Sequence, residues 1–490
     1  MKFQHGISIL MAILMVSSLS ACSSGMKNPL DPNNPTEIKV WNYYNSDQLT
    51  AFNKLVTDFN SSVGFKQGIV VTSESQGNVD TLADNLIDSV NGEIGSDPVP
   101  NIASIYSETA YILNKKDILL SFDDYFTTDE LNKYIPGFIE EGRLVENGPL
   151  KILPVSKSTE VFAVNKTYWA PFEEATGNSI DDITDIEALV KIAGEYYEWS
   201  DGLTPDVPED GKCLYGRDSM ANYIFIGMQQ LGHQLFTVKG DKPTTDFDKA
   251  SFRKLWDNFY IPYINGYFGS KGKFGSDDLS SGYTICLTGS SSGANYFPTK
   301  ITTSGDETQA VEFTIKKPLC FKDSLNVAVQ QGAGYSVIKG TEAENYASVV
   351  FLKWLTESDR NLEFSVLSGY SPVTKEANNE DTIKESFKTG ETSAKKTNIY
   401  NSLLVSSQVY NQWDTFTTKP FEKSKAVRSS LDSVLLNIAK ADRASVIAAI
   451  EGGASRSEAV SQYTTDDYFD QWYASFKTEI EGIINSAVSE

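Results

Sequence analysis

The chain has 490 residues, of which 42 are basic and 65 acidic, so its formal charge is −23 at neutral pH. Such an acidic chain, with no basic stripe, excludes a nucleic-acid-binding protein of the usual electrostatic kind. Its length is enough for two or three domain cores, and we expect the acidity to serve solubility more than ligand choice.

The first segment has the composition of a removable secretory signal. Lys2 precedes an apolar run, residues 7–16, that is too short to span a bilayer as a helix. The run ends in Leu-Ser-Ala-Cys at residues 19–22, which resembles a bacterial lipobox. We therefore expect residues 1–21 to be removed and Cys22 to carry a lipid that anchors the protein to a bacterial membrane, outside the cytoplasm. Residues 22–36, which contain three Pro and three Asn, predict a flexible tether.

Few residues that bind metals or act as nucleophiles remain after the signal segment. Once Cys22 is acylated, Cys213, Cys286 and Cys320 are left, at spacings that match no metal-binding pattern. Their odd number allows one disulfide at most, and we expect all three in the core. His233 is the single histidine outside the signal segment, so it cannot build a convincing triad, and a buried structural role is expected for it. The sequence predicts no metal, no cofactor and no catalytic centre.

Strands and helices alternate in the first part of the mature chain. Alternating side chains in residues 37–42 predict a half-buried strand, and apolar residues at helical spacing in residues 46–59 predict a helix after it. Further strands are predicted at residues 69–72 and 102–106, and a helix follows each. This alternation predicts βαβ units in a largely parallel sheet.

Polar and aromatic residues follow each of these strands. Ligands of such sheets lie beyond the carboxyl ends of the strands, so these residues are predicted to share one rim. Some of them will instead cap the helices that begin there. The candidates for ligand binding on this rim are Tyr43, Tyr44, Asn45, Gln76, Asn78, Tyr106, Ser107 and Glu108.

A second pattern begins at residues 153–166, where a Pro, a short polar run and an apolar strand follow one another. Pro cannot lie in a central strand ladder, so Pro154 marks an edge or a crossing point. Ser158 and Thr159 are short and leave backbone and hydroxyl donors free to face a ligand. Taken alone, the same pattern is also that of a loop entering a strand.

Strand and helix patterns resume beyond this stretch. The strand predicted at residues 283–287 ends in Thr-Gly-Ser-Ser-Ser-Gly, whose free N–H groups and hydroxyls suit ligand oxygens, at Ser290, Ser291 and Ser292. The turn is not a P-loop, because Gly-Lys-Ser/Thr is absent, and a plain glycine-serine turn is the alternative. Aromatic residues at helical spacing in residues 252–260 and 468–476 are predicted to be core.

Four stretches of the chain, in the same order, resemble segments of the extracellular solute-binding proteins of ABC importers. The similar branch includes the maltodextrin and glycerol-3-phosphate binders, and the resemblance runs from about residue 37 to residue 375. The stretches are residues 153–166, with Val164 where the family usually has Tyr, residues 288–293, residues 326–335, and residues 351–373, where Gly-Tyr-x-Pro-Val follows a Phe-Leu-x-x-Leu-Thr helix.

The resemblance implies an α/β fold with two lobes, each a mostly parallel sheet flanked by helices, and three hinge crossings. Lobe I would comprise residues 37–155 and 329–369, and lobe II residues 156–328 and 370–490. Further ligand contacts implied by the family are Ser219, Asn222 and Tyr223 from the second lobe, Gly332, Ala333 and Gly334 from the second crossing, and Tyr370 from the third.

The implied function is that of a monomeric, lipid-anchored receptor. It would capture a carbohydrate or polyol between its lobes and deliver it to the permease subunits of an ABC importer. Glycerol-3-phosphate binders also place an Arg downstream of the tyrosine segment to meet the phosphate. No Arg around residues 419–428 aligns securely with it, so an uncharged carbohydrate is expected.

The sequence leaves two other classes of protein as alternatives. A lipid-anchored glycoside hydrolase is the main alternative, because the 65 carboxylates offer many possible acid–base pairs. A barrel-type hydrolase would need about eight strand–helix units, however, and the pattern shows two runs joined by crossings. A surface adhesin would show β-rich repeats, and none is visible.

Overall fold

The computed structural model describes residues 28–207, 209–240, 242–302, 308–388 and 393–486. The predicted signal segment, the lipidated Cys22 and the start of the tether fall within residues 1–27, outside the described residues. None of the helices in the described ranges is both long enough and apolar enough to cross a membrane.

The described chain is built from alternating strands and helices. The strands are β1 (Thr36–Asn42), β2 (Ile69–Ser75), β3 (Ile102–Ile105), β4 (Glu160–Asn165), β5 (Tyr215–Arg217), β6 (Phe236–Lys239), β7 (Lys242–Thr245), β8 (Cys286–Ser290), β9 (Lys300–Thr302), β10 (Thr308–Ala310), β11 (Phe313–Lys316), β12 (Val327–Val329), β13 (Gly334–Val337) and β14 (Asp414–Phe416). The helices are α1 (Ser46–Phe59), α2 (Phe65–Gln67), α3 (Val79–Asn91), α4 (Ser107–Lys115), α5 (Thr128–Leu131), α6 (Pro136–Gly142), α7 (Lys166–Thr176), α8 (Ile186–Asp201), α9 (Met220–Gln230), α10 (Lys249–Ile264), α11 (Gly275–Ser281), α12 (Glu342–Leu355), α13 (Ser358–Ser368), α14 (Glu380–Ser386), α15 (Ala394–Gln412), α16 (Ser424–Glu451), α17 (Arg456–Val460) and α18 (Asp466–Asn485).

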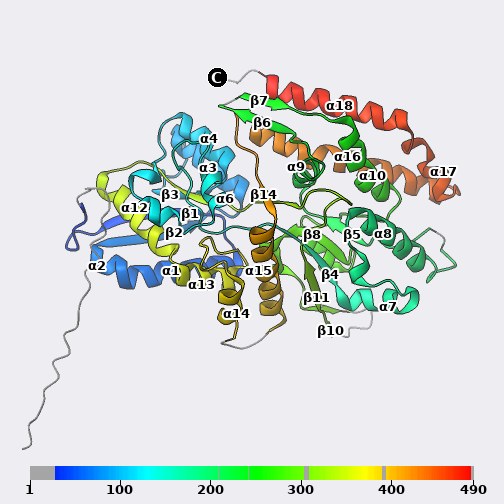
Figure 1. Cartoon of the computed structure of the whole chain (residues 1–490), viewed down its shortest axis with the longest axis horizontal. Coiled ribbons are helices and arrows are strands. Elements are labelled where there is room, and N and C mark those ends of the chain that lie inside the picture. Colours follow the sequence, from blue (N-terminus) through cyan, green and yellow to red (C-terminus); the bar gives the residue numbers. More distant parts are fainter. Residues whose placement is uncertain (1–27, 208, 241, 303–307, 389–392, 487–490) are drawn as a thin grey trace, which may run out of the picture.

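Two four-stranded sheets lie side by side, each covered by helices (Figure 1). In the first sheet, with strand order β13-β3-β1-β2, β1 pairs in parallel with β2 and β3, and β13 is antiparallel to β3. The expected βαβ alternation is therefore confirmed here. The second sheet, with order β11-β4-β8-β5, differs from the expectation of a mostly parallel sheet. Its β4 is antiparallel to both β8 and β11, and β5 pairs with β8 in parallel. Both sheets are thus mixed.

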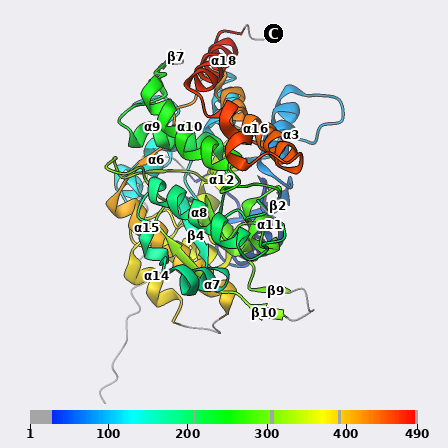
Figure 2. The same cartoon turned by 90° about the vertical axis from the view of Figure 1, so that its right-hand side faces the viewer.

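Each sheet has its own hydrophobic core. The first core gathers buried residues between Ile38 and Val155 and again between Ala333 and Val373. The second gathers residues from Phe162 to Phe321 and from Phe421 to Ile480, with α7–α10, α16 and α18 around it (Figure 2). Tyr370 packs in the first core, just beyond the boundary predicted for that lobe.

Most of the aromatic residues predicted to be core are buried, whereas Tyr468 and Tyr473 are partly buried against the second core. On α10, Trp256 and Tyr260 are buried and stacked with ring centroids 3.6 Å apart. On α18, Phe469, Trp472 and Phe476 are buried against them in the second core. Aromatic side chains remove large apolar areas from water, so these pairs fix α18 on α10.

The segments predicted as crossings are hydrogen-bonded to one another between the cores. Isolated bridges join Leu153 to Tyr335, Lys157 to Ser371 and Ser158 to Gln331. Gly332 makes this close approach possible: its φ is +93°, and a Cβ atom there would lie 2.9 Å from the Ser156 carbonyl oxygen. The crossing segments therefore form one connected strip.

The described end of the predicted tether contacts the first core. Leu30 is partly buried against that core, and the Thr36 N–H donates to the Gly68 carbonyl at 2.8 Å. Asp31 and Asn34 form a short turn beside Gly68. An apolar side chain among the prolines anchors this end, so residues 28–36 differ from a fully flexible linker.

Candidate functional site

A cavity of about 350 Å³ lies between the two cores. The first core contributes residues from the start of α3, the start of α4 and the end of α6. The second contributes residues from α9 and from the start of α16, and the strip adds residues 329–331. Cavities of this size that are shared by two bodies of a chain are typical ligand sites.

The first wall of the cavity is formed at the carboxyl end of β3, where Tyr106, Ser107 and Glu108 enter α4. Burial raises the pKa of the Tyr106 phenol to about 12, and the nearby Arg428 acts against this rise. Glu108 and Asp80, on the same wall, form no ion pair with any residue in the described part of the chain. This wall offers acceptors to a bound ligand.

The second wall presents an amide pair and a guanidinium. Asn222, near the start of α9, donates from Nδ2 to Gln331 Oε1 at 3.0 Å, and its Oδ1 accepts from Arg428 Nη2 at 2.8 Å. Asn222, Gln331 and Arg428 all line the cavity. The residues come from a helix of the second core, from the strip and from α16, so the fold alone brings them together.

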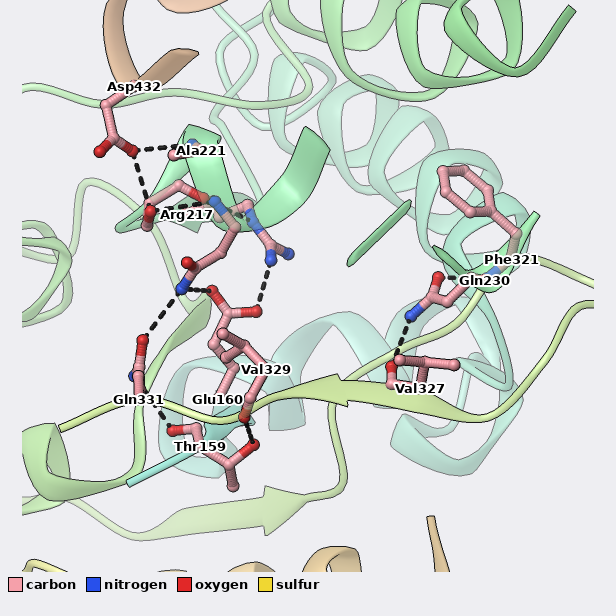
Figure 3. Close-up of polar contacts among 12 residues, drawn as sticks. Thr159, Glu160, Arg217, Ala221, Gln230, Phe321, Val327, Val329, Gln331 and Asp432 are labelled. Carbon is pink, nitrogen blue, oxygen red and sulfur yellow. Dashed lines mark hydrogen bonds and ion pairs between the residues drawn. The ribbon is translucent and has the colours of Figure 1, made fainter. Parts of the chain in front are cut away.

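A buried ion pair lies directly behind this wall (Figure 3). Glu160, the first residue of β4, accepts from Arg217 at 2.5 Å and from Asn222 Nδ2 at 3.1 Å. The Glu160 side chain is 4% exposed and that of Arg217 is 8% exposed. Buried charges need partners, and here each ion has the other plus a neutral hydrogen-bonding group.

A third group of charges connects the cavity to the strip. Lys157 is 2% exposed, and its Nζ donates to Glu141 Oε1 at 2.7 Å and to the Gly332 carbonyl at 2.5 Å. Glu141 also accepts from Gln330, and both Glu141 and Gln330 line the cavity. A cavity residue is therefore bound directly to a cation in the crossing strip.

This arrangement agrees with the comparison against protein families. A family model described as bacterial extracellular solute-binding protein matches residues 54–389, more than half of the chain. The chain belongs to this family. As a solute-binding protein it is a receptor and not an enzyme, so the glycoside hydrolase alternative is set aside. No curated protein sequence matches the chain.

Solved structures of solute-binding proteins have the same fold. A cyclic α-maltosyl-1,6-maltose binding protein from Arthrobacter globiformis is 17% identical, with a TM-score of 0.61 over 91% of this chain and 100% of that one. UgpB from Mycobacterium tuberculosis, in complex with glycerophosphocholine, is 15% identical, with a TM-score of 0.63 over 92% and 99%. A protein of Agrobacterium radiobacter in complex with ribitol is 14% identical, with a TM-score of 0.60 over 92% and 100%.

Four of the residues that the sequence singled out line the cavity of this solute-binding protein: Tyr106, Ser107, Glu108 and Asn222. Ser219 lies beside them but is occupied as the N-cap of α9, and its hydroxyl donates to Asp432 at 2.8 Å. Tyr223, expected to contact the ligand, is buried in the second core with its hydroxyl on the Leu255 carbonyl. Tyr223 directly follows Asn222 on α9, and successive side chains of a helix point in different directions, so Tyr223 faces the core and not the cavity.

A tyrosine cluster holds three more of the predicted residues. The Tyr370 hydroxyl donates to the Tyr43 hydroxyl at 3.3 Å, and Tyr44 pairs with Ser156 at 2.9 Å. Burial, followed by the nearby Tyr106 and Tyr44, raises the pKa of Tyr370 above its usual range. The cluster thus borders Tyr106 but packs in the first core, outside the cavity lining.

The predicted hydroxyl residues at positions 158–159 and 290–292 are hydrogen-bonded within the protein. The Thr159 hydroxyl donates to the Val329 carbonyl at 2.7 Å, and Ser158 pairs with Gln331. The Ser291 N–H donates to the Thr159 carbonyl at 2.8 Å, so the expected donor nest is already used in part. Ser290 and Ser292 are bonded to each other at 3.0 Å.

The other predicted residues lie at turns and close contacts. Gln76 accepts from Asn85, Asn78 caps α3, and Asn45 accepts from Tyr296 across the two cores at 3.1 Å. Gly332, Ala333 and Gly334 allow the strip to approach residues 152–158. A Cβ on Gly334 would lie 2.7 Å from the Leu153 carbonyl oxygen, which explains that glycine by packing.

Sequence reasoning missed Arg428, Gln331, Glu141 and Asp432, which all line the cavity. Arg428 lies within residues 419–428, where no Arg could be aligned securely with the family. Its position near the start of a long helix, α16, was the signal that could have identified it. The expected core positions of the cysteines hold for Cys286, whereas Cys213 and Cys320 are half-buried, and all three are free thiols. His233 is not buried: its side chain is 35% exposed beside Asp246.

Proposed function

We propose that this solute-binding protein captures a carbohydrate or polyol in the cavity between its cores and passes it to the permease of an ABC importer. The observation that carries the proposal is the shared cavity itself, because acceptors on the first wall face donors on the second. A polyhydroxy ligand can donate to Glu108 and Asp80 and accept from Arg428 and Gln331.

Aromatic rings complete the lining. Tyr106 lies on the first wall, and Phe225 and Phe416 lie on the opposite side. Sugars need polar partners for their hydroxyls and apolar faces for their C–H surfaces, and tyrosine and phenylalanine provide such faces. Two of the proteins similar in fold are a cyclic α-maltosyl-1,6-maltose binding protein and a protein in complex with ribitol, which supports the same class of ligand here.

Delivery to a permease depends on a change of shape that the ligand favours. A ligand that contacts both walls binds more tightly to the closed form, in which the cores are together, than to an open form, in which they are apart. The ligand therefore shifts the population towards the closed form. A permease that recognises this form would then accept loaded receptor in preference to empty receptor.

A thermal-shift screen over monosaccharides, oligosaccharides, sugar phosphates and polyols tests this proposal. A true ligand at about 100 times its Kd should stabilise the protein by about 2.7 kcal/mol and should reduce its radius of gyration in small-angle scattering. The variant Arg428→Met should lose the shift, whereas Lys116→Met, outside the cavity lining, should keep it. A panel that produces no shift in the wild type counts against the carbohydrate assignment.

The lipid anchor is a separate part of the proposal and rests on the Leu-Ser-Ala-Cys pattern at residues 19–22. Expression in a bacterial host with a labelled fatty acid should place the label on the protein and hold it in the membrane fraction. Cys22→Ser should lose the label and appear in the soluble fraction. An unlabelled wild-type protein would exclude the anchor without touching the ligand assignment.

A further inference from the structure

The second wall of the cavity is organised by a residue that does not line it. Glu160 Oε1 accepts from Asn222 Nδ2 at 3.1 Å, and the same Nδ2 donates to Gln331 Oε1 at 3.0 Å. An amide nitrogen carries two hydrogens, so both are used, and none is left for a ligand. Asn222 therefore faces the cavity as an acceptor only.

Glu160 also decides which way round the Asn222 amide lies. A flipped amide would set its oxygen against the Glu160 carboxylate and its NH₂ group against the Arg428 guanidinium, which replaces two attractive contacts with repulsive ones. A carboxylate accepts and never donates, so it admits one orientation. In that orientation Oδ1 accepts from Arg428 Nη2 at 2.8 Å.

Arg428 keeps most of its donors for the cavity. A guanidinium has five N–H groups, and the contact with Asn222 is the single hydrogen bond that Arg428 makes to the described part of the chain. Gln331 donates from Nε2 to the Thr159 carbonyl at 3.3 Å, which leaves one further N–H. The wall thus presents several donors held at one place.

We propose that Glu160 is a positioning residue that fixes the hydrogen-bonding polarity of this wall. Through Asn222 it aims Arg428 into the cavity, so that the wall binds an acceptor oxygen of the ligand. This inference rests on the proposed ligand-binding function of the cavity. Its structural part, the dependence of Arg428 on Glu160, can be tested without any ligand.

The variant Glu160→Gln tests that dependence with almost no change in volume. If the new amide keeps its oxygen on Arg217, its NH₂ group faces Asn222, which then turns its own oxygen inwards and its NH₂ group towards Arg428. Crystal structures of wild type and variant should show the contact between Arg428 Nη2 and Asn222 Oδ1 lengthened beyond about 3.5 Å, the limit of a hydrogen bond. In the double variant Glu160→Gln/Arg217→Met nothing holds the new amide oxygen away from Asn222, so this oxygen can accept from Asn222 Nδ2 and Arg428 should keep its wild-type contact.

The matched control is Arg217→Lys, which keeps the Glu160 carboxylate and its contact with Asn222. Arg428 should stay in place in this control and should move in Glu160→Gln. Movement in both variants would assign the effect to loss of packing around the ion pair and overturn the inference. An Arg428 that stays in place in Glu160→Gln would overturn it as well.

Binding of ribitol and of maltotriose gives the second measurement, by titration calorimetry. Where wild type binds either probe, Glu160→Gln should weaken it by about 10- to 100-fold, the loss expected for a charged hydrogen bond, and Arg217→Lys should change it less than about threefold. Unchanged binding in Glu160→Gln would overturn the role of Glu160 in recognition. If wild type binds no member of the wider panel, the proposed function fails, while the crystal structures still decide whether Glu160 positions Arg428.

Discussion

Two neighbouring glutamates of α6 each form an ion pair with a lysine, and the two pairs differ in how far they are buried. Glu141 pairs with Lys157, and the two side chains are 12% and 2% exposed. Glu140, one position earlier, pairs with Lys419 from the opposite core, with exposures of 53% and 25%. The inner pair is almost fully buried, whereas the outer pair is partly exposed to water, with Lys419 at the cavity.

The difference between these pairs is one of desolvation. Removing one member of a buried pair leaves a charge without a partner in a medium of low dielectric, whereas an exposed charge is simply rehydrated. Further pairs of the outer kind join the cores, among them Lys425 with Asp84, Lys115 with Glu422 and Lys395 with Asp47. We therefore expect the inner pair to hold the strip and the outer pairs to adjust how the cores meet.

The largest effect is expected from Lys157→Met. The change leaves Glu141 without its cation and removes a donor to the Gly332 carbonyl. It should lower the free energy of unfolding by about 3–5 kcal/mol, measured by urea denaturation. The double variant Lys157→Met/Glu141→Gln should recover a large part of this loss, because no buried charge is left unpaired. A loss below about 1 kcal/mol in the single variant would show that water reaches Glu141.

A smaller effect is expected from the outer pairs. Lys425→Met removes the contact with Asp84, whose side chain is 65% exposed, and should cost less than about 1 kcal/mol. Combined with Glu422→Gln, it should weaken the contact between the cores. Small-angle scattering of this double variant should give a larger radius of gyration than wild type at low salt, and the two should converge in about 0.5 M salt, because salt screens exposed pairs. A difference that persists at high salt would contradict this account.

The smallest effect is expected from His233, which follows α9 and has a side chain that is 35% exposed. Its Nδ1 is 2.9 Å from Asp246 Oδ2, and this hydrogen bond raises the pKa of His233 above its usual value near 6.5. A raised pKa means that the folded protein binds the proton more tightly. The stabilisation is therefore fully present below about pH 6.5 and is lost as the pH rises through the folded-state pKa.

His233→Gln tests this pH dependence. At about pH 5.5 wild type should have a higher melting temperature than the variant, and at about pH 9 the two should melt together. The difference in stability at the lower pH should be less than about 1 kcal/mol, as expected of an exposed ion pair. Asp246 and Asp248 face the imidazole, so Asp246→Asn should reproduce most of the change. A constant difference at both pH values would assign the effect to packing.

Much of the fold could be predicted from the sequence because its signals are local. Periodicity at residues 37–106 predicts β1, β2 and β3 with helices between them. The parallel pairing expected for the second sheet was wrong, because periodicity identifies a strand but not the direction of its neighbour. That direction depends on long connections, such as the one from β4 to β8.

The candidate site could be predicted on one wall and not on the other. Tyr106, Ser107 and Glu108 follow β3 directly in the chain, so the end of a strand predicts them. Arg428 and Gln331 lie 206 and 109 positions from Asn222 along the chain, and nothing local links them. Glu160 occupies a strand position that the sequence marked only as part of a crossing.

The sequence by itself determined that strands and helices alternate in residues 37–106, because apolar periodicity acts over a few residues. Tertiary structure alone decided that Glu160, Asn222, Gln331 and Arg428 meet behind and along one wall of the cavity. The orientation of a buried amide depends on the charges around it, and those charges come from segments that only folding brings within hydrogen-bonding distance.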